Sequence, residues 1–376
     1  MRIGYDAKRV FLNMTGLGNY SRSLIKGIAS LFPDNEYFLY TPGIVQSARV
    51  DFFKEQKHIW ITTPKNQRFA SLWRSKFVVK DLKTAGIQIY HGLSHEIPIG
   101  IDKTGIKSVV TIHDLIFKRY PKYFGFISRQ IYQAKIKYAC KHANHIIAVS
   151  QRTKDDLVEL LNVDPEKVEV IYQNCDAIFR VKQTDLKKGE VKLKYNLPKK
   201  FILNVGTIEE RKNLLVLIKA FHRLPSETYL VIVGKETNYS KKVKQYITRN
   251  KLANRITFIP NASFGDLPSI YQLAEIFVYP SRYEGFGIPI LEALVSGTPV
   301  IAATGSCLDE AGGPDSLYVG PDDEKDLTDK ISLLLSNKNL QKTMIEKGHI
   351  YAQKFEDKVL ATQLMDLYTK VVNHVE

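Results

Sequence analysis

Short apolar runs alternate with amphipathic stretches from one end of the chain to the other. Runs such as Phe201–Val205 are apolar at successive positions, which is typical of parallel strands that helices cover on both faces. In the first half, the pattern predicts strands at Arg2–Tyr5, Glu36–Tyr40, Ile87–Tyr90, Ser108–Ile112, His145–Val149 and Val168–Ile171. In the second half, it predicts strands at Phe201–Val205, Tyr229–Val233, Ile256–Ile259, Ile276–Tyr279 and Val300–Ala302, with a short edge strand at Leu317–Val319. Two such sets predict an α/β fold with two Rossmann-like doubly wound domains.

The break between the two sets falls in Val181–Lys200, which is rich in lysine and shows no sustained apolar period. A chain of 376 residues also favours two hydrophobic cores over one. We therefore expect an N-terminal domain over residues 1–185, a linker, and a C-terminal domain over residues 198–356. Helices at Asn339–Gln353 and Asp357–Val372 are expected after the last strand.

The composition, with 44% apolar and 25% charged residues, is that of a globular protein. Cys140, Cys175 and Cys307 lie far apart and have neither zinc-ligand spacing nor the pattern of a disulfide framework, so buried reduced thiols are expected. Met1 is followed by a predicted strand rather than by an apolar signal segment, and no apolar run approaches the roughly 20 residues that span a bilayer. These features predict a cytoplasmic protein.

The net charge of +15 is concentrated in the first part of the chain. Residues 1–150 hold 23 Lys/Arg and 9 Asp/Glu, or +14, whereas residues 151–376 hold 31 and 30, or +1. Such an asymmetry indicates an acidic partner. Arg68–Lys83, with Trp73 and Phe77, predicts an amphipathic helix, and Lys118–Lys141 interleaves cations with aromatic residues. Our hypothesis is peripheral contact with the anionic inner face of a membrane; a helix packed on the sheet is the alternative.

The most informative stretch is residues 279–300, where a predicted strand is followed by a glycine-containing loop and a helix. Pro289 stands in the first turn of that helix, and Gly297 follows its end. Free amides at such a helix start bind anions and suit a diphosphate. Glu284 lies in the loop, at the sheet edge where these folds bind ligands, and the carboxylate of Glu292 can accept two hydrogen bonds from a ribose diol. The alternative is an ordinary Gly/Pro turn before a helix with a solvated glutamate.

Seven residues separate Glu284 from Glu292, and this spacing resembles the E-x7-E motif of the family 4 retaining glycosyltransferases. The resemblance extends to the surrounding sequence, Tyr-Pro-Ser-Arg-Tyr-Glu-Gly-Phe-Gly-Ile-Pro-Ile-Leu-Glu-Ala-Leu. The resemblance covers the whole chain and is stronger after residue 200. It implies the GT-B fold, with two domains facing across a cleft and the last helix, at about 357–376, packed back on the first domain. It also implies that Glu284 holds hydroxyls of the transferred sugar and that Glu292 holds the nucleotide ribose. The distal phosphate would bind the backbone amides of Gly285, Phe286, Gly287 and Ile288.

A second segment, Val205–Asn213, contains Gly206 and opens another helix. Arg211 and Lys212 can both reach a diphosphate from this turn; a solvated basic turn is the alternative. Similar proteins place an Arg and a Lys here to neutralise the leaving diphosphate. Lys212 matches their Lys, but their usual Arg is Thr207 in this chain, so we expect Arg211 to take its role. The Gly-Thr-x-x-x-Arg-Lys-Asn form resembles the mannosyltransferase-B-like branch, which favours GDP-mannose.

The nucleobase is less well defined. Asn261 stands in the turn where similar proteins bind the base through backbone groups. They commonly have a glycine at the position of Pro260, and the proline lacks the amide hydrogen, so a UDP-sugar donor stays open.

In the first domain, Gly16 and Gly18 precede a helix and could cap a phosphate, although ordinary strand–helix turns also contain such glycines. His113 ends a predicted buried strand, and similar enzymes carry a histidine here that contacts the donor sugar. His91 ends the preceding strand and is a weaker candidate on the acceptor side.

Together these features predict retaining transfer of a hexose, most simply mannose from GDP-mannose, to a glycan or a lipid-diphosphate-linked acceptor in cell-surface polysaccharide synthesis. Arg211, Lys212 and the helix amides are expected to replace a metal in stabilising the leaving diphosphate. Asp155–Asp156 and Asp322–Asp323 are adjacent pairs rather than a spaced Asp-x-Asp. The alternatives are a transferase that uses a UDP-sugar, a nucleotide-sugar epimerase, a nucleic-acid-binding protein and a non-catalytic scaffold. No nucleic-acid recognition motif accompanies the basic charge, and a scaffold would have lost the site residues.

Overall fold

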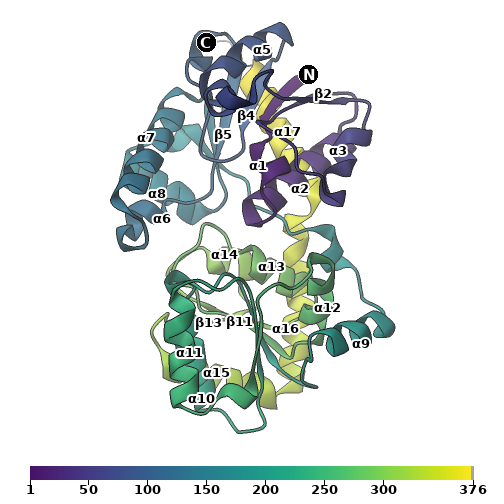
Figure 1. Cartoon of the computed structure of the whole chain (residues 1–376), viewed down its shortest axis with the longest axis vertical. Helices are drawn as coiled ribbons and strands as arrows, with labels where there is room; N and C mark the ends of the chain where they lie inside the picture. The colour runs from purple at the N-terminus through teal and green to yellow at the C-terminus, as the bar shows by residue number, and fades with distance from the viewer. Residues whose placement is uncertain (374–376) are drawn as a thin grey trace. The chain divides into compact units, whose positions relative to one another are not determined.

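The computed structural model describes residues 1–373, which form two compact units (Figure 1). Unit 1 consists of Met1–Asn174 together with the C-terminal segment that begins at Lys354, and unit 2 consists of Cys175–Gln353. Each unit contains one parallel sheet with helices on both of its faces. The expected α/β class with two doubly wound sheets is therefore confirmed. The last residues of the expected C-terminal helix, 374–376, lie outside the described part of the chain.

Unit 1 is built on a seven-stranded parallel sheet. In spatial order, the strands are β3 (Ile59–Thr62), β2 (Glu36–Tyr40), β1 (Arg2–Asp6), β4 (Ile89–Gly92), β5 (Lys107–Ile112), β6 (His145–Ala148) and β7 (Val168–Val170). The register pairs Tyr5 of β1 with Leu39 of β2 on one side and with His91 of β4 on the other. The chain leaves β1 towards β2 and leaves β4 towards β5, so the order of the strands reverses between β1 and β4.

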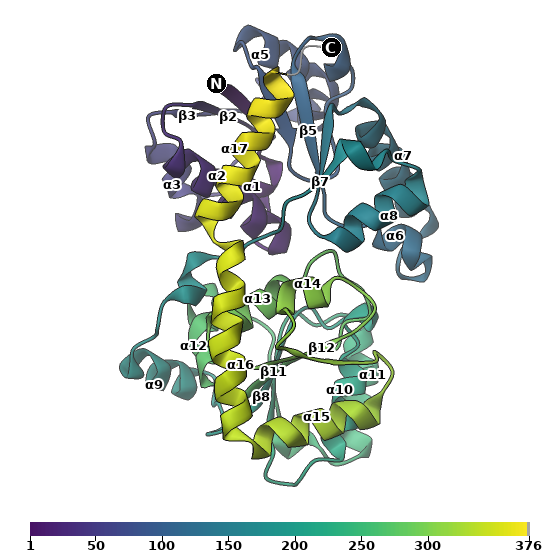
Figure 2. The same cartoon turned by 180° about the vertical axis from the view of Figure 1, so that it is seen from behind.

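The helices of unit 1 cover the two faces of this sheet. They are α1 (Lys8–Leu12), α2 (Gly16–Leu31), α3 (Asp51–Glu55), α4 (Ala70–Leu72), α5 (Val78–Thr84), α6 (Ile116–Arg119), α7 (Phe126–His142), α8 (Gln151–Leu161) and α17 (Asp357–Asn373). One core packs α1, α2, α3 and α17 against the sheet, and a second core packs α5, α7 and α8 against the other face. Figure 2 shows α17, in yellow, lying alongside α2.

A buried polar chain fixes α17 to the sheet. The hydroxyl of Tyr368 in α17 lies 2.6 Å from Nδ1 of His91 and 3.3 Å from the hydroxyl of Tyr5. Nε2 of His91 lies 2.8 Å from Oγ1 of Thr111. His91 is fully buried, and burial lowers the pKa of its imidazole to about 3. Both of its ring nitrogens therefore form hydrogen bonds inside the core. His91, the weaker acceptor-side candidate, thus has a structural role.

Unit 2 is built on a six-stranded parallel sheet. Its strands, in spatial order, are β10 (Ile256–Ile259), β9 (Leu230–Val233), β8 (Ile202–Val205), β11 (Ile276–Tyr279), β12 (Val300–Ala303) and β13 (Leu317–Val319). The helices are α9 (Asp185–Lys194), α10 (Leu214–His222), α11 (Tyr239–Arg249), α12 (Leu267–Leu273), α13 (Ile288–Val295), α14 (Leu308–Gly312), α15 (Glu324–Ser336) and α16 (Lys338–Tyr351). Helices α10, α11 and α15 pack on one face, whereas Phe277 of β11 meets Tyr271 of α12 on the other.

Two features differ from the sequence expectation. Strand β3, which the hydrophobic pattern did not single out, is short, and Trp60 in it is 40% exposed at the edge of the sheet. The segment expected to be a linker holds helix α9, and the compact units divide earlier, between Asn174 and Cys175. Helix α9 starts at a Thr184 cap and is tied to Asp266 by Lys187 and Lys194 at 2.8 and 2.7 Å.

The basic segment expected as one amphipathic helix is helical but not uniform. It passes from α4 through a π-helical turn, Trp73–Phe77, into α5. Trp73 is buried and donates its indole N–H to Asp81 at 2.6 Å, whereas Phe77 is 53% exposed. The expected aromatic pair is thus divided between the core and the surface. None of the helices in residues 1–373 combines the length and apolar character needed to cross a membrane.

Candidate functional site

The carboxyl edge of the unit 2 sheet brings together the two segments that the sequence singled out. The chain leaves β8 towards β9 and leaves β11 towards β12, so the strand order reverses between β8 and β11. Loops that follow strands at such a reversal point form the usual ligand crevice of this architecture. Here they are residues 206–213 after β8 and residues 280–287 after β11.

Glu284 is the centre of the contacts between these two loops. Its Oε1 accepts hydrogen bonds from Lys212 Nζ at 2.6 Å, from Ser281 Oγ at 2.7 Å and from the Tyr279 hydroxyl at 3.0 Å. Its Oε2 lies 2.8 Å from a guanidinium nitrogen of Arg211. The side chain is only 12% exposed, so this carboxylate joins two cations in a poorly solvated setting.

The charges set the protonation states of this cluster. Burial alone would raise the pKa of the Glu284 carboxyl, but the positive charges of Arg211 and Lys212 lower it to about 2. Burial lowers the pKa of Lys212, and the negative charge of Glu284 opposes that shift. Glu284 is therefore ionised at neutral pH, and its charge offsets those of the cations beside it.

The cluster retains hydrogen-bonding capacity for a ligand. Arg211 donates to Glu284, to the Tyr283 carbonyl and to Oε1 of Glu209 at 2.6 Å, so two of its five N–H groups have no protein acceptor among the described residues. Lys212 donates to Glu284 and to the Tyr279 hydroxyl, which leaves one of the three N–H groups of its ammonium for a ligand. Oε1 of Glu284 is crowded, whereas Oε2 has room for a further donor such as a sugar hydroxyl.

Helix α13 begins beside this cluster. Gly287 caps it with φ +130°, and Ile288 and Pro289 form its first turn. A Cβ on Gly287 would lie 3.2 Å from both Ala311 and Leu308, so this position requires glycine for its conformation as well as for space. The amides of Gly285, Phe286, Gly287 and Ile288 thus belong to a defined helix entry, as an anion-binding site needs.

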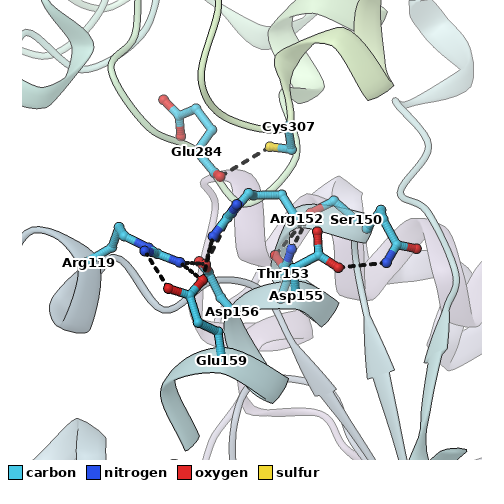
Figure 3. Close-up of polar contacts among 10 residues, drawn as sticks. Arg119, Ser150, Arg152, Thr153, Asp155, Asp156, Glu159, Glu284 and Cys307 are labelled. Carbon is cyan, nitrogen blue, oxygen red and sulfur yellow. Dashed lines mark hydrogen bonds and ion pairs between the residues drawn. The ribbon is translucent and has the colours of Figure 1, made fainter. Parts of the chain in front are cut away.

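Cys307 contacts the same loop. Its thiol lies 3.1 Å from the carbonyl oxygen of Glu284 and 3.0 Å from that of Phe286, as Figure 3 shows for the first contact. The side chain is fully buried, and burial raises the pKa of the thiol well above its ordinary value. It stays a protonated donor that positions the loop rather than a reactive nucleophile.

Glu292, the second glutamate of the motif, is a buried residue of α13. Its Oε2 accepts a hydrogen bond from the hydroxyl of Tyr271 at 2.8 Å, and the residue is 8% exposed. Burial raises the pKa of this carboxyl to about 8; the Tyr271 hydroxyl partly offsets that shift, and Asp176 adds to it. The two glutamates of the motif therefore carry opposite protonation states at neutral pH.

The remaining candidate residues of unit 2 are not part of the Glu284 cluster. Gly206 follows β8 with φ +151°, and its carbonyl lies where a Cβ on Gly234 would fall, at 1.9 Å. Thr207, at the position of the usual arginine, is exposed and lies outside the Glu284 cluster. Asn261 is exposed in the turn after β10, and it makes no hydrogen bond to the Glu284 cluster among the described residues.

In unit 1, the structure places Gly16 and Gly18 at the start of α2. A Cβ on Gly18 would lie 1.7 Å from the carbonyl oxygen of Asn13, so this glycine is needed for close packing of the preceding loop. Gly16 has open space around it, as a ligand-facing position would.

His113 is enclosed within unit 1. Its Nε2 donates to the Leu93 carbonyl at 2.8 Å, and its Nδ1 accepts from the side-chain amide of Gln173 at 2.8 Å. Burial lowers the pKa of this imidazole to about 3, and the nearby His95 adds to the shift. His113 is neutral with both ring nitrogens occupied, so a polar contact between its ring and a donor sugar requires one of these bonds to be exchanged.

Sequence reasoning missed several members of the site. Tyr279 and Ser281 stand inside the motif, but their spacing could not reveal that both hydroxyls donate hydrogen bonds to Glu284. Tyr271 and Cys307 come from other parts of the chain and carry no local signal. Glu209 precedes Arg211 by two residues, and this spacing in a turn was a usable hint of their ion pair.

Two family models match the chain in succession. The model described as "Glycosyltransferase Family 4" matches residues 14–176, and the model described as "Glycosyl transferases group 1" matches residues 187–350. The fold and the site thus define a glycosyltransferase, and enzymes of this class take the sugar from a nucleotide-sugar donor. The chain belongs to the family 4 glycosyltransferases.

Curated relatives agree with this family, and solved structures share the fold. O-antigen chain mannosyltransferase RfbU of Salmonella typhimurium is 34% identical over 61% of this chain and 60% of that relative. O-antigen chain mannosyltransferase B of Escherichia coli is 25% identical over 98% of this chain and 99% of its own length. A glycosyltransferase structure from Rickettsia africae covers 100% of this chain and 99% of that chain, with a TM-score of 0.78 at 20% identity. The structure of Anabaena HepE in complex with UDP and glucose covers 98% of this chain and 100% of that chain, with a TM-score of 0.75 at 21% identity. The two structures share the fold.

Replacing Glu284 by glutamine should damage both stability and activity. Removing the charge leaves Arg211 and Lys212 without their shared partner, and breaking such a buried pair costs about 3 kcal/mol of unfolding free energy. Loss of the positioned carboxylate should lower sugar transfer about 100-fold or more. Urea unfolding and initial-rate assays measure the two effects. Glu210→Gln, at an exposed position of the same loop, is the control and should change neither. Near-normal transfer by Glu284→Gln would refute this view of the site.

The raised pKa of Glu292 predicts pH-dependent donor binding. Ribose hydroxyls donate to the ionised carboxylate, whereas the free protein holds a proton there below about pH 8. Binding therefore releases that proton, and donor affinity should rise roughly tenfold per pH unit from pH 6 towards pH 8 and then level off. Calorimetric titration with GDP-mannose or UDP-glucose measures this dependence, because these diphosphate diesters do not titrate in that range.

The matched control is Glu292→Gln, in which the pH dependence should disappear. Tyr271 and Cys175, which lie near this carboxyl, both have raised pKa values and do not titrate in the window. The same slope in wild type and variant would show that another group carries the proton.

Proposed function

We propose that this glycosyltransferase transfers mannose from GDP-mannose, with retention of configuration, to a glycan or lipid-linked glycan in cell-surface polysaccharide synthesis. The observation that carries the proposal is the bridge from Glu284 to Arg211 and Lys212 beside the start of α13. The names of the two curated relatives, both O-antigen chain mannosyltransferases, support mannose and the polysaccharide context.

Each group in the site has a role in this reaction. Glu284 orients the sugar through the open side of Oε2, and Glu292 binds the ribose diol. As the bond to the sugar breaks, negative charge builds on the leaving diphosphate, and the spare donors of Arg211 and Lys212 together with the α13 amides stabilise it. Because these groups supply the positive charge, we propose that transfer needs no metal and proceeds equally in EDTA and in Mg²⁺.

Glu284 acts by position rather than as a covalent nucleophile. Its pKa of about 2 and its four protein contacts make the carboxylate a weak base. A poorly basic carboxylate that two cations hold in place attacks carbon slowly, whereas its open Oε2 position can still accept a hydrogen bond from a sugar hydroxyl. The acceptor hydroxyl therefore meets an oxocarbenium-like sugar on the face that the diphosphate leaves.

The direct test offers the protein a panel of GDP-mannose, UDP-glucose and ADP-glucose, with and without a lipid-linked glycan fraction. We expect GDP release and α-mannoside formation only when the acceptor is present, with the product anomer assigned by NMR. Release of UDP instead of GDP would show that the donor is a UDP-sugar. Conversion of a donor sugar without any acceptor would identify an epimerase and contradict transfer.

We also propose that unit 1 meets an anionic membrane surface through the first turns of α7. Phe126, Ile127 and Ile131 are 66%, 74% and 51% exposed there. Arg129 lies 5.6 Å from the ring centre of Phe126, so cations accompany the apolar surface. An apolar strip flanked by cations suits the boundary of acidic headgroups and acyl chains, where a lipid-linked acceptor would lie.

Ile127→Glu should weaken binding to phosphatidylglycerol vesicles at least about fivefold, because burying an isoleucine side chain is worth about 1.5–3 kcal/mol. Co-sedimentation measures the binding. Leu193→Glu, at an 85% exposed apolar residue of α9 in unit 2, is the matched control and should bind like wild type. Equal sedimentation of wild type with anionic and neutral vesicles would refute membrane contact.

A further inference from the structure

Unit 1 has a reversal point of its own, between β1 and β4. The residues that follow these strands are Ala7–Arg9 and Leu93–His95. Since adjacent parallel strands end at the same edge, the two segments lie side by side where doubly wound sheets bind ligands. The site residues argued above leave these two segments without an assigned role.

The turn after β4 is constrained. A Cβ on Gly92 would lie 1.9 Å from the carbonyl oxygen of Glu96, so the backbone folds back tightly on itself. His95 has φ +63°, which is uncommon for a residue with a side chain, and its amide donates to the Thr111 carbonyl at 2.9 Å. Strained backbone of this kind persists where the surroundings enforce it, and it concentrates at functional sites.

This turn also holds two unsatisfied polar atoms. Oγ of Ser94 and Nδ1 of His95 are buried and have no hydrogen-bond partner in residues 1–373. Burial lowers the pKa of His95 to about 4, so its ring is neutral at physiological pH. Leaving such atoms unpaired costs stability, so both are poised for hydrogen bonds with a ligand.

Two cations that form no ion pair of their own among the described residues lie beside this turn. Lys8 and Arg9 are half-buried, and neither side chain forms a hydrogen bond or ion pair within the described part of the chain. Arg9 lies near enough to lower the pKa of both His95 and His113, which locates its charge beside the turn. Arg74 differs, because it pairs with Asp6 and Glu96 at 2.5 Å each.

The surrounding charges favour an anion over a neutral sugar. Glu96, the acidic residue of the turn, is already engaged by Arg74 and by Lys135 at 2.9 Å. Asp6 forms an ion pair with Arg74, and its Oδ1 accepts a hydrogen bond from the Lys8 amide at 3.2 Å. Asp6 and Glu96 attract Lys8 through space, but both are ion-paired with Arg74, and Glu96 also with Lys135, so Lys8 and Arg9 leave an excess of positive charge here. Half-buried cations gain most from a multiply charged anion.

We propose that Lys8, Arg9, Ser94 and His95 bind the phosphate group of a diphosphate-linked acceptor. The inference rests on the proposed transferase function and adds which residues of unit 1 recognise the acceptor and by what chemistry. Lys8 and Arg9 match two phosphate charges, and the Ser94 hydroxyl and the neutral His95 ring complete the contacts. The donor diphosphate is the competing source of the same chemistry, and it already has cations and helix amides in unit 2.

Binding of farnesyl diphosphate, inorganic pyrophosphate and GDP to the full-length protein tests the proposal by calorimetry. In Lys8→Met/Arg9→Met, we expect farnesyl diphosphate and pyrophosphate to bind about tenfold more weakly for each cation removed, and GDP to bind as in wild type. Lys103→Met, an exposed cation of the same unit, is the control and should alter none of the three.

Ser94→Ala separates a binding role from a structural one. Removing a buried, unpaired hydroxyl should leave the melting temperature unchanged or raise it, while farnesyl diphosphate affinity falls severalfold. A drop in melting temperature with unchanged affinity would assign the hydroxyl to the fold and overturn the proposal. Weaker binding of GDP but not of farnesyl diphosphate in the cation variant would assign the site to the donor and overturn it too.

These outcomes are distinct from failure of the proposed function. If wild type binds farnesyl diphosphate through these residues yet transfers no sugar, the acceptor site stands and the donor assignment falls. If transfer proceeds and the cation variant keeps the wild-type KM for the lipid-linked acceptor, the acceptor site falls alone.

Discussion

The attraction of one poorly solvated carboxylate for two cations fixes the proposed donor site of unit 2. Glu284 comes from the loop after β11, and Arg211 and Lys212 come from the loop after β8, so their ion pairs join two segments about 70 residues apart in the chain. A backbone hydrogen bond also joins the two loops, because the Arg211 carbonyl accepts from the Arg282 amide at 2.9 Å. The start of α13 and the thiol of Cys307 then take their positions from the same loop.

The two units treat positive charge in different ways. In unit 2, Glu284 and Glu209 offset the charges of Arg211 and Lys212, so the site is neutral until a diphosphate adds its own charge. In unit 1, Lys8 and Arg9 have no such partners at the corresponding reversal point of the sheet. The sequence shows the same contrast, with +14 in residues 1–150 and +1 in the rest. The balanced site suits a ligand that must leave after reaction, and the unbalanced one suits capture of a charged acceptor.

Most of the fold was predictable because both sheets are parallel and their strands are apolar on both faces. Strand β3 escaped notice because four residues with the half-exposed Trp60 give little pattern. Helix α9 escaped because Leu186 and Leu193 point to solvent and only Val191 is buried, so tertiary contacts to Asp266 replace an apolar stripe.

The motif Glu284–Glu292 was visible as a local pattern, but the opposite protonation of its two glutamates was not. That difference arises from depth and neighbours: Arg211 and Lys212 stand beside Glu284, whereas Glu292 has a tyrosine hydroxyl. The unpaired atoms of Ser94 and His95 likewise depend on how the β4 turn packs, which no spacing in the sequence encodes.

Comparing the binding of GDP with that of GMP shows whether Arg211 and Lys212 hold the donor diphosphate. Wild type should bind GDP much more tightly than GMP, because only GDP places a second phosphate among these donors. In Lys212→Met, which keeps the Arg211–Glu284 pair, the ratio of GDP to GMP affinity should fall about tenfold while GMP binding stays unchanged. An unchanged ratio, including an equal loss for both nucleotides, would show that Lys212 does not bind the second phosphate.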